Sequence, residues 1–252
     1  MLDQITPLIL TRDEEANIGR TLAQLTWASD VVIVDSLSTD RTLEIARSFP
    51  NVRVFQRELD TLAQQTTYGL QQVRTPWVLL LDADYFVPDS FADEARALQP
   101  SSNVRAYRAA FDYAVNGRKL RASLYPPRIV LLHRDHTTVW QDGHTPRFLA
   151  DGDVGTLRTK LVHDDRKDFA RFLARQKKYM REEADKLRHA DPRALTTAGR
   201  VRRLIVIAPF AVVLHTLFVK GLILDGRAGL RYVWERFVAE VMLSRELLRR
   251  RN

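Results

Sequence analysis

Short apolar runs alternate with segments of helical periodicity over the first hundred residues. Four of the apolar runs have the length and composition of strands: ITPLIL (5–10), VVIV (31–34), VRVF (52–55) and WVLLL (77–81). They lack apolar–polar alternation, which fits strands that are covered on both sides. Helical spacing returns between them, at residues 18–25 and 62–73. Strands that alternate with helices predict a mainly parallel α/β sheet with helices on both faces.

The pattern changes in the middle of the chain. Residues 105–115 and 118–125 flank the dipeptide Asn116-Gly117, which is typical of the centre of a two-residue hairpin turn. RIVLLHR (128–134) is a further strand candidate. This stretch predicts antiparallel strands, so the complete sheet is expected to be mixed.

From Asp165 onward the period is helical. Apolar positions between Phe169 and Leu187 trace one face of a helix. Residues 230–248 form another, with apolar residues on one side and arginines opposite. The change of pattern divides the chain into two predicted regions, an α/β region at 1–165 and a helical region at 166–252.

The apolar segment 204–224 is long enough to span a bilayer. It contains Pro209, which would kink it, as well as His215 and Lys220. Arginines flank both of its ends, whereas a simple span has positive charge mainly on one side. We therefore predict a kinked, re-entrant or interfacial helix, followed by an amphipathic helix that lies on anionic lipid. A buried hairpin in a soluble domain, or a dimer interface, is the alternative interpretation.

Composition narrows the class of protein. The chain has 252 residues, of which 45% are hydrophobic and 28% charged, so it can form a packed core. The absence of cysteine excludes a disulfide framework and a thiolate metal site, and it fits a reducing compartment. The N-terminus lacks the basic start and long apolar run of a secretory signal. A net charge of +8 favours a phosphate-bearing partner, which can be nucleic acid, anionic lipid or a phosphorylated substrate.

Acidic side chains stand where several predicted strands end. Asp82 and Asp84 follow WVLLL, Asp35 follows VVIV, and the first strand runs into LTRDEEANI (10–18). Ligands of open parallel sheets bind at the carboxyl ends of the strands, so we expect these groups in one crevice. Two carboxylates suit Mg²⁺ or Mn²⁺ together with phosphate oxygens. A D-x-D motif in isolation is more often a plain polar strand end.

Five segments carry a resemblance to a known family, in the order in which that family has them: LTRDEEANI (10–18), VVIVDSLSTDRT (31–42), LLLDADY (79–85), WQDGHTPRF (140–148) and LVHDDRK (161–167). Together they resemble the inverting GT-A glycosyltransferases of family 2, over about residues 3–165. DGHT, HDDRK and LDGRAGL (224–230) are most similar to a subgroup with lipopolysaccharide core β-1,4-glucosyltransferases. The resemblance implies a GT-A (Rossmann-like) sheet, mixed and mainly parallel. The helical pattern after residue 165 adds a C-terminal extension that is expected to associate with a membrane.

The resemblance also implies roles for individual residues. Asp142 is expected to be the catalytic base that takes the proton of the acceptor hydroxyl. Asp84 and His163 are expected to bind the Mg²⁺ or Mn²⁺ that neutralises the leaving diphosphate. Contacts to the substrates are expected from seven residues: Thr11, Asp13, Glu14, Asp35, Asp82, His144 and Arg166.

Several of these residues have a plainer interpretation. Asp142-Gly143 is also a common turn, which would leave His144 as an ordinary turn histidine. His163 can be a surface or core histidine, and Arg166 a surface charge at a helix start. Asp35 can cap the helix that follows it, and acids such as Glu14 suit a first helical turn in any case.

The chain departs from the family pattern at three positions. Asp13 stands where asparagine is frequent, Leu37 where glycine is common, and Tyr85 where an acid often follows D-x-D. The first and third differences can alter donor preference. None of them removes a residue that the chemistry requires.

The predicted reaction transfers a sugar, with inversion, from a nucleoside-diphosphate sugar to a hydroxyl group. The donor is expected to be UDP-linked. The acceptor is expected to be lipid-linked, either lipopolysaccharide core or another cell-envelope glycan, which predicts a peripheral or monotopic protein on the cytoplasmic face of the inner membrane. A polyprenyl-phosphate sugar transferase is the alternative enzyme. A basic nucleic-acid-binding protein is the non-enzymatic alternative, but we find neither a recognition-helix motif nor aromatic residues interleaved with arginine, so no nucleic-acid partner is expected.

Overall fold

The computed structural model describes residues 1–143, 145–193 and 195–249. The chain forms two compact units. The first consists of Met1–Asp112 and Tyr125–Arg166, and the second of Tyr113–Leu124 and the chain from Lys167 onward.

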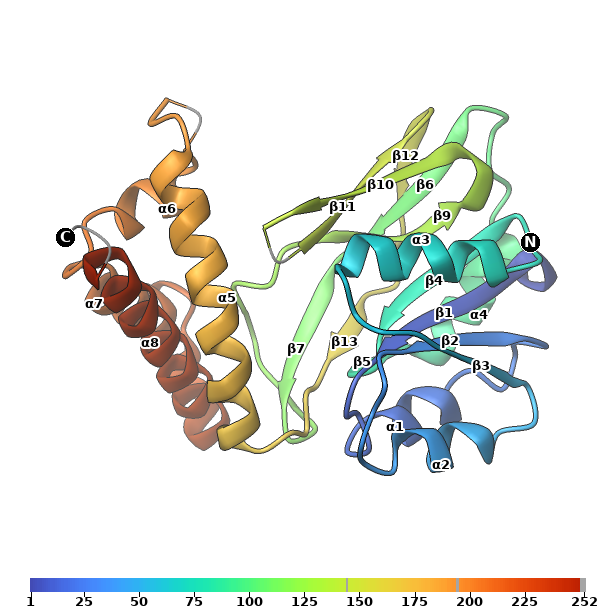
Figure 1. Ribbon diagram of the computed structural model, residues 1–252, viewed down its shortest axis with the longest axis horizontal. Helices are drawn as coiled ribbons and strands as arrows, with labels where there is room; N and C mark the ends of the chain where they lie inside the picture. The colour runs from blue at the N-terminus through green and yellow to red at the C-terminus, as the bar shows by residue number, and fades with distance from the viewer. Residues whose placement is uncertain (144, 194, 250–252) are drawn as a thin grey trace. The chain divides into compact units, whose positions relative to one another are not determined.

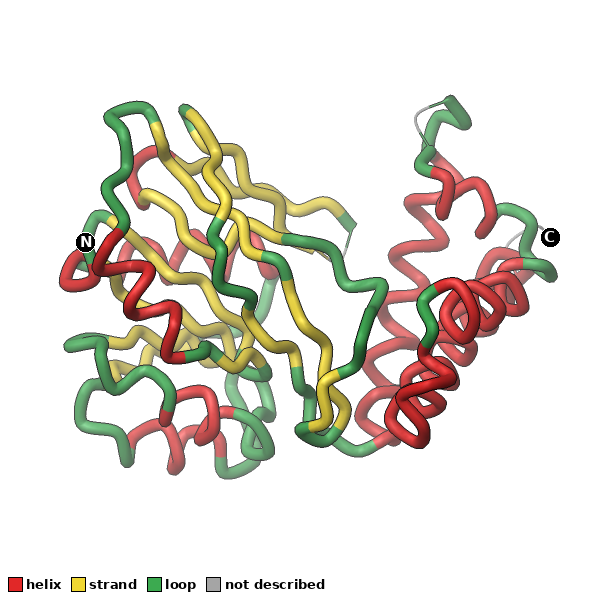
Figure 2. Tube along the Cα trace, turned by 180° about the vertical axis from the view of Figure 1, so that it is seen from behind, coloured by secondary structure: helices red, strands yellow, loops and turns green. Residues whose placement is uncertain are grey.

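A seven-stranded mixed sheet is the centre of the first unit (Figures 1 and 2). Its strands, in spatial order, are β12 (Asp153–Thr156), β6 (Val104–Ala109), β9 (Arg128–His133), β4 (Trp77–Asp82), β1 (Ile5–Thr11), β2 (Val31–Asp35) and β3 (Val52–Gln56). The last four are parallel, β9 is antiparallel to both of its neighbours, and β12 is parallel to β6. The predicted mixed, mainly parallel α/β fold is confirmed.

Apolar clusters cover both faces of this sheet, because successive side chains of a strand point to opposite faces. Ile9 and Ile33 pack on the face covered by α1 (Ile18–Ala23), α2 (Thr42–Arg47) and α4 (Asp89–Ala97). Leu8 and Val32 pack on the other face, which α3 (Leu62–Gln72) and the hairpin of β10 (Thr137–Asp142) and β11 (Thr145–Ala150) cover. Cover on both sides explains why the central strands are continuous apolar runs.

Four short strands complete the β structure. β5 (Tyr85–Phe86) follows β4 after a turn and pairs antiparallel with β13 (Leu161–His163), which sets His163 opposite Tyr85. β7 (Phe111–Val115) and β8 (Arg118–Lys119) form the hairpin predicted around Asn116-Gly117. The φ angles of 51° at Asn116 and 83° at Gly117 are those of a type I′ turn.

Helices make up most of the second unit: α5 (Phe169–His189), α6 (Thr197–Arg202), α7 (Ala208–Leu214) and α8 (Gly226–Arg249). Short 3-10 turns occur at Leu2–Gln4 and Arg134–His136 of the first unit. α5 and α8 pack through Ala184, Leu187, Leu243 and Leu247. These two helices confirm the amphipathic segments that the periodicity predicts after Asp165.

Residues 113–124 lie within the predicted 1–165 region but belong to the second unit. Leu120 packs in one apolar cluster with Leu222 and Tyr232. Arg121 donates to Asp225 from its backbone N–H and from Nε, both at 3.0 Å. Contacts that are distant in sequence therefore draw this hairpin out of the region where the pattern alone places it.

The apolar segment 204–224 is broken into short pieces. α7 continues into a π-helical turn, His215–Val219, and after Gly221, whose φ is 69°, a 3-10 turn covers Leu222–Asp225. The sequence predicts that Pro209 kinks a longer helix, and this prediction is wrong. Pro209 occupies the first turn of α7, where its missing N–H costs no hydrogen bond. In the described residues no single helix is long and apolar enough to cross a bilayer; the pair Ala208–Val219 and Leu222–Arg249, bent by 72°, has sufficient length and composition only when taken together.

Candidate functional site

Asp35 lies at the carboxyl end of β2, and its side chain is fully buried. The Thr11 hydroxyl, at the end of the neighbouring strand β1, donates to its Oδ2 at 2.7 Å. The Ser38 hydroxyl donates to the same oxygen at 2.5 Å, and the Ser38 N–H donates to Oδ1 at 2.9 Å. The predicted pair Thr11 and Asp35 is therefore in direct contact, and Asp35 also braces the loop that follows β2.

The loop after β1 is tied to the loop after β2. The Asp13 N–H donates to the Ser38 hydroxyl at 2.8 Å, and the Thr39 N–H donates back to the Asp13 carboxylate at 2.8 Å. The Glu14 N–H donates to the Thr42 hydroxyl at 2.7 Å. The residues predicted to contact the nucleotide thus form one interlocked edge along the ends of two parallel strands, where such folds bind ligands.

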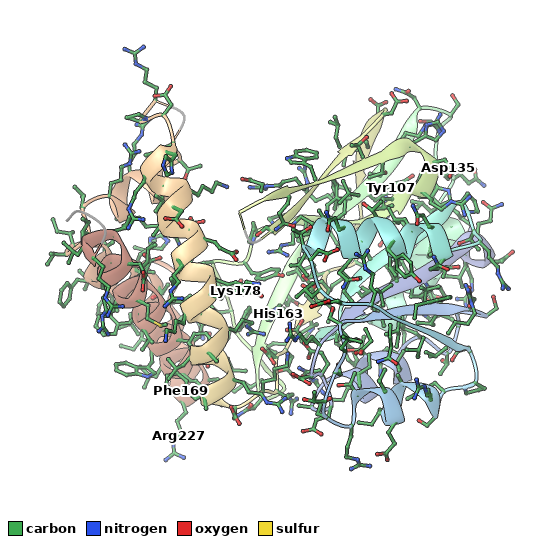
Figure 3. The ribbon with its side chains drawn as sticks, viewed as in Figure 1. Tyr107, Asp135, His163, Phe169, Lys178 and Arg227 are labelled. Carbon is green, nitrogen blue, oxygen red and sulfur yellow. The ribbon has the colours of Figure 1, made fainter. Side chains whose placement is uncertain are left out.

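The two carboxylates of the D-x-D motif differ in environment. Asp82, the last residue of β4, is exposed, whereas Asp84 is only 7% exposed. The Asp84 Oδ2 lies 3.5 Å from Nε2 of His163, which β13 presents through its pairing with β5 (Figure 3). The tertiary structure therefore brings together the two residues predicted to bind the cation, although 78 residues lie between them in the sequence.

Tyr85, Tyr125 and Arg128 adjoin this pair and were not predicted as site residues. The two tyrosine hydroxyls are 2.5 Å apart, and the Tyr125 ring lies 4.8 Å from the His163 ring. The Arg128 guanidinium lies 4.7 Å from the centre of the Tyr125 ring. Burial, reinforced by the Asp82 charge, raises the pKa of both tyrosine hydroxyls, which keeps them protonated. In the sequence, the only hint of Tyr125 and Arg128 is the segment LYPPR (124–128), which runs into β9 and has a basic residue shortly after an aromatic one.

Burial disfavours the charged form of Arg128, but Tyr85, Tyr125 and Asp82 more than offset it and raise the pKa of this arginine. Arg128 is therefore a permanent cation beside the D-x-D motif. A fixed positive charge in this place can attract the phosphate groups of a ligand.

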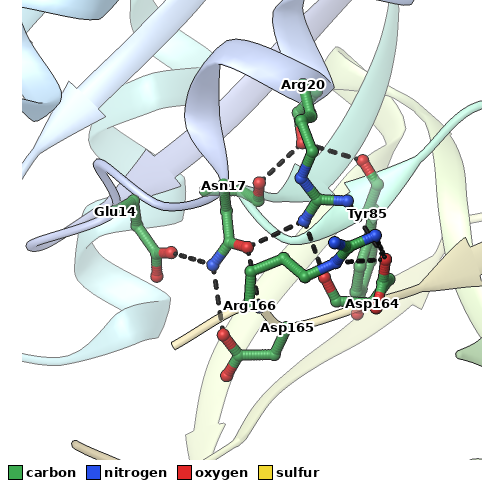
Figure 4. A network of polar contacts seen from close by, with 9 residues as sticks. Glu14, Asn17, Arg20, Tyr85, Asp164, Asp165 and Arg166 are labelled. Atoms are coloured by element: carbon green, nitrogen blue, oxygen red, sulfur yellow. Dashed lines mark hydrogen bonds and ion pairs between the residues drawn. The ribbon is translucent and has the colours of Figure 1, made fainter. Parts of the chain in front are cut away.

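A polar network joins the loop after β1 to the chain after β13 (Figure 4). The buried Asp164 accepts from Arg20 Nη1 at 3.1 Å and from Arg166 Nε at 2.7 Å. Asn17 donates to Asp165 at 3.1 Å and accepts from the Arg166 N–H at 2.9 Å. Arg166, which the sequence assigns to the diphosphate, thus has its guanidinium held by Asp164. Asn17 and Asp164 lie within the quoted motifs but received no role from them, and Arg20 lies outside the motifs.

Asp142 ends β10, and its Oδ2 accepts from Arg147 Nε of β11 at 2.9 Å. The neighbouring Gln141 accepts from the Ala63 N–H at 3.0 Å, which fixes the end of this hairpin to the first turn of α3. The Arg147 side chain of β11 therefore orients the Asp142 carboxylate, and the contact of Gln141 with α3 fixes the backbone beside it. His144, the predicted acceptor contact, lies outside the described residues.

The donor set at Asp84 and His163 suits a divalent cation that takes its other ligands from phosphate and water. One carboxylate and one imidazole supply two positions, and Mg²⁺ and Mn²⁺ commonly bind with few protein ligands. The described residues contain no group of three or more His, Cys, Asp or Glu side chains that could hold a metal. The residues present therefore fit a cation that is shared with a diphosphate, and a site made of protein ligands alone is not seen among them.

Residues 8–99 match the model of a protein family described as Glycosyl transferase family 2. The lipopolysaccharide core biosynthesis glycosyltransferase LpsC of Rhizobium meliloti is 25% identical over 172 residues, which are 63% of this chain and 62% of that protein. An uncharacterized glycosyltransferase of Rickettsia typhi is 29% identical over 109 residues, 43% of this chain and 37% of that protein. The matched parts thus span less than two thirds of either curated relative.

Among solved structures, mannosyl-3-phosphoglycerate synthase from Rubrobacter xylanophilus is similar in fold. The TM-score is 0.50 at 14% sequence identity, and the match covers 76% of this chain and 78% of that one. The observed mixed sheet, the family match and the structural match all indicate a fold like that of glycosyltransferases. Residues 8–99 of the chain thus resemble family 2 glycosyltransferases, the fold is similar to that of mannosyl-3-phosphoglycerate synthase, and the chain resembles an enzyme of lipopolysaccharide core biosynthesis.

Proposed function

We propose that the first unit is an inverting glycosyltransferase that moves a sugar from a nucleoside-diphosphate sugar to an acceptor hydroxyl. The observation that carries the proposal is the contact between Asp84 and His163 at the end of β4, beside the loops that Asp35 braces. A buried carboxylate next to an imidazole, at the edge where parallel strands end, is suited to the charged part of a nucleotide. We assign the donor as UDP-linked, as the resemblance implies.

The loops after β1 and β2 are assigned to the nucleoside. Hydrogen bonds of Thr11, Asp13, Glu14 and Asp35 fix the conformation of these loops. The base and ribose would therefore bind to a surface that is already formed before the nucleotide arrives. Asp82 is exposed beside them and can accept a hydrogen bond from the ribose. A preformed edge reduces the ordering cost of binding the donor.

Asp84 and His163 are assigned to Mg²⁺ or Mn²⁺. Such a cation, when bound, neutralises the charge that develops on the leaving diphosphate. Arg128 contributes a fixed positive charge near Asp82, and we assign it to the diphosphate together with Arg166. The hydrogen bond from Arg166 to Asp164 holds the guanidinium in place for this contact.

Asp142 is assigned as the base that removes the proton of the acceptor hydroxyl. Its ion pair with Arg147 and the anchor of Gln141 on α3 fix the position of the carboxylate. Such positioning supports proton transfer, because a base acts only within hydrogen-bond reach of the proton it takes. The predicted contact of His144 with the acceptor remains a proposal.

We assign the acceptor to a lipid-linked cell-envelope glycan, because the LpsC protein that this chain resembles is named for lipopolysaccharide core biosynthesis. For such an acceptor, the reaction takes place at the cytoplasmic face of the inner membrane. Transfer to a polyprenyl phosphate instead would identify the alternative enzyme.

The test combines binding and transfer measurements on the full chain. Nucleotide-sugar binding in the presence of Mn²⁺ is measured by calorimetry, and transfer is followed with a panel of donors and with lipid-linked acceptors. Asp84→Ala should weaken Mn²⁺-dependent nucleotide binding by about tenfold or more. Asp142→Asn should retain nucleotide binding and lose about 10²–10⁴-fold in transfer.

Asp153→Asn is the matched control, because Asp153 is an exposed carboxylate at the start of β12. It should behave as the wild type in both measurements. Wild-type binding and turnover in both site variants would refute the site assignment, and the absence of binding to every nucleotide sugar would refute the function.

A further inference from the structure

The segment 204–248 exposes many large apolar side chains. Six of them are Phe210, Leu214, Phe218, Leu224, Trp234 and Leu248. We call the exposed apolar side chains of residues 204–248 the C-terminal apolar surface. Soluble proteins rarely leave so much apolar area uncovered within one segment, so a large exposed patch indicates a binding surface.

The spacing of these residues shows that they share helix faces. Phe210, Leu214 and Phe218 are four positions apart along α7 and the π-helical turn that continues it. On α8, the exposed positions 230, 234, 241 and 248 repeat at intervals of four and seven, which keeps them on one side of the helix.

Ring contacts join the two helices at this surface. The Phe210 ring lies 6.2 Å from the Phe237 ring, and Phe237 lies 5.6 Å from Trp234. An apolar groove lined by Phe210, Phe237, Val241 and Leu248 runs beside these rings, and Arg245 and Arg249 also line it. The apolar side chains of α7 and α8 are therefore parts of one surface.

The acidic side chains of this segment are all engaged in ion pairs. Between residues 204 and 249 each of the four acids pairs with an arginine: Asp225 with Arg121, Glu235 with Arg231, Glu240 with Arg202, and Glu246 with Arg181 and Arg249. Three of these acids are buried, and Glu246 is largely buried as well.

The exposed charges of the same stretch are basic. Arg227 extends away from the helices (Figure 3), and Arg245 lies between the apolar positions 241 and 248 on α8. In the described part of the chain neither guanidinium has an ion-pair partner. The surface is therefore apolar with a positively charged margin.

We propose that the C-terminal apolar surface binds the interface of a membrane that contains anionic phospholipids. Phenylalanine, leucine and tryptophan insert at the level of the headgroups and the upper acyl chains, while arginines at the margin pair with lipid phosphates. This proposal is independent of glycosyl transfer, because it requires neither donor nor acceptor.

A second copy of the chain fits this surface less well. In a two-fold symmetric dimer the same patch meets itself. The basic margin of one copy would then face the basic margin of the other, and the acids of this segment are already engaged inside the unit. Anionic lipid supplies the opposite charge that a second copy lacks.

The test is co-sedimentation of the full chain with vesicles of phosphatidylcholine, with and without added phosphatidylglycerol. The wild type should bind the anionic vesicles and bind the neutral ones far more weakly. Phe218→Ser combined with Trp234→Ser should reduce the partition coefficient on anionic vesicles by about tenfold or more. The two side chains are 63% and 55% exposed, so their replacement leaves the core intact.

Two matched controls separate the apolar and the charged contributions. Leu149→Ser removes an exposed leucine of β11 in the first unit and should leave binding unchanged. Arg227→Gln with Arg245→Gln should weaken binding to anionic vesicles only, whereas Arg47→Gln with Arg74→Gln removes the same charge from the first unit and should have little effect.

Three results would overturn the proposal. The first is the absence of binding to either kind of vesicle. The second is equal binding to neutral and anionic vesicles. The third is a concentration-dependent dimer that Phe218→Ser with Trp234→Ser dissociates while vesicle binding is unaffected, since the surface would then be covered by a second copy.

Discussion

Two residues at the candidate site have a backbone conformation that their side chains do not favour. Asp13 and Leu37 have φ angles of 53° and 59°, in the left-handed region. Aspartate tolerates this region comparatively well, as does the asparagine that is frequent in the family at position 13. Leucine does not, and glycine is common where Leu37 stands in the family that the chain resembles. Both departures thus lie at positions where the backbone is left-handed, in the two loops that are tied to each other.

Replacement of Leu37 by glycine should stabilise the protein. The side chain is 51% exposed, so little packing is lost, and the backbone strain of a left-handed leucine is relieved. The greater freedom of glycine in the unfolded chain offsets part of the gain, which leaves about 1 kcal/mol. Urea unfolding measures the difference. Leu149→Gly, at an exposed strand position without positive φ, is the control and should destabilise.

At the scale of elements, short helices are held by contacts from elsewhere in the chain. α6 has only six residues, and Arg202 near its end pairs with Glu183 of α5 at 3.0 Å and with Glu240 of α8 at 2.8 Å. Burial disfavours the charge on Arg202, but the two glutamates outweigh it and raise the pKa of the arginine. One side chain therefore joins three helices of the second unit.

Arg202→Ala should destabilise the second unit by about 3 kcal/mol, because it leaves Glu240 buried without its partner. Thermal unfolding followed by circular dichroism measures the change. Arg200→Ala, an exposed arginine of the same helix, should have an effect within about 0.5 kcal/mol of zero. Equal stabilities of the two variants would contradict the structural role of Arg202.

At the scale of the whole molecule, the distribution of charge matters more than the net value of +8. In the first unit, acids gather at the strand ends, where we propose that a cation and a nucleotide bind. In the C-terminal segment the acids are engaged internally, and basic groups remain exposed. The excess of arginine in the composition therefore reflects a surface property of the second unit.

The free energy of unfolding should decrease in alkaline solution. Burial raises the pKa of Tyr85 and Tyr125 above the ordinary value of 10.0, so the folded state retains these protons more tightly than the unfolded chain. This stabilisation is complete below pH 10.0 and is lost as the pH rises toward the pKa of the folded state.

Chemical unfolding at about pH 8 and about pH 11 measures this loss. The double variant Tyr85→Phe with Tyr125→Phe should lose less stability between the two conditions than the wild type. An equal loss in both proteins would show that other groups govern the alkaline response.

The sequence by itself determined the elements and their order. Apolar runs and helical periodicity predicted the strands of the parallel half, the hairpin at Asn116-Gly117, and helices α5 and α8, because each depends on spacing within a short segment. The five motifs also placed the candidate residues at strand ends. The individual roles of those residues stay predictions.

Only the tertiary structure decided what these residues contact. It brought His163 to Asp84, placed Arg128 beside the D-x-D motif, engaged Arg166 with Asp164, and moved residues 113–124 into the second unit. It also showed that the apolar segment 204–224 is broken at Gly221 and leaves large apolar side chains such as Phe210 and Val219 exposed. These outcomes depend on contacts between residues far apart in the chain, and local patterns of hydrophobicity and charge carry no information about such pairings.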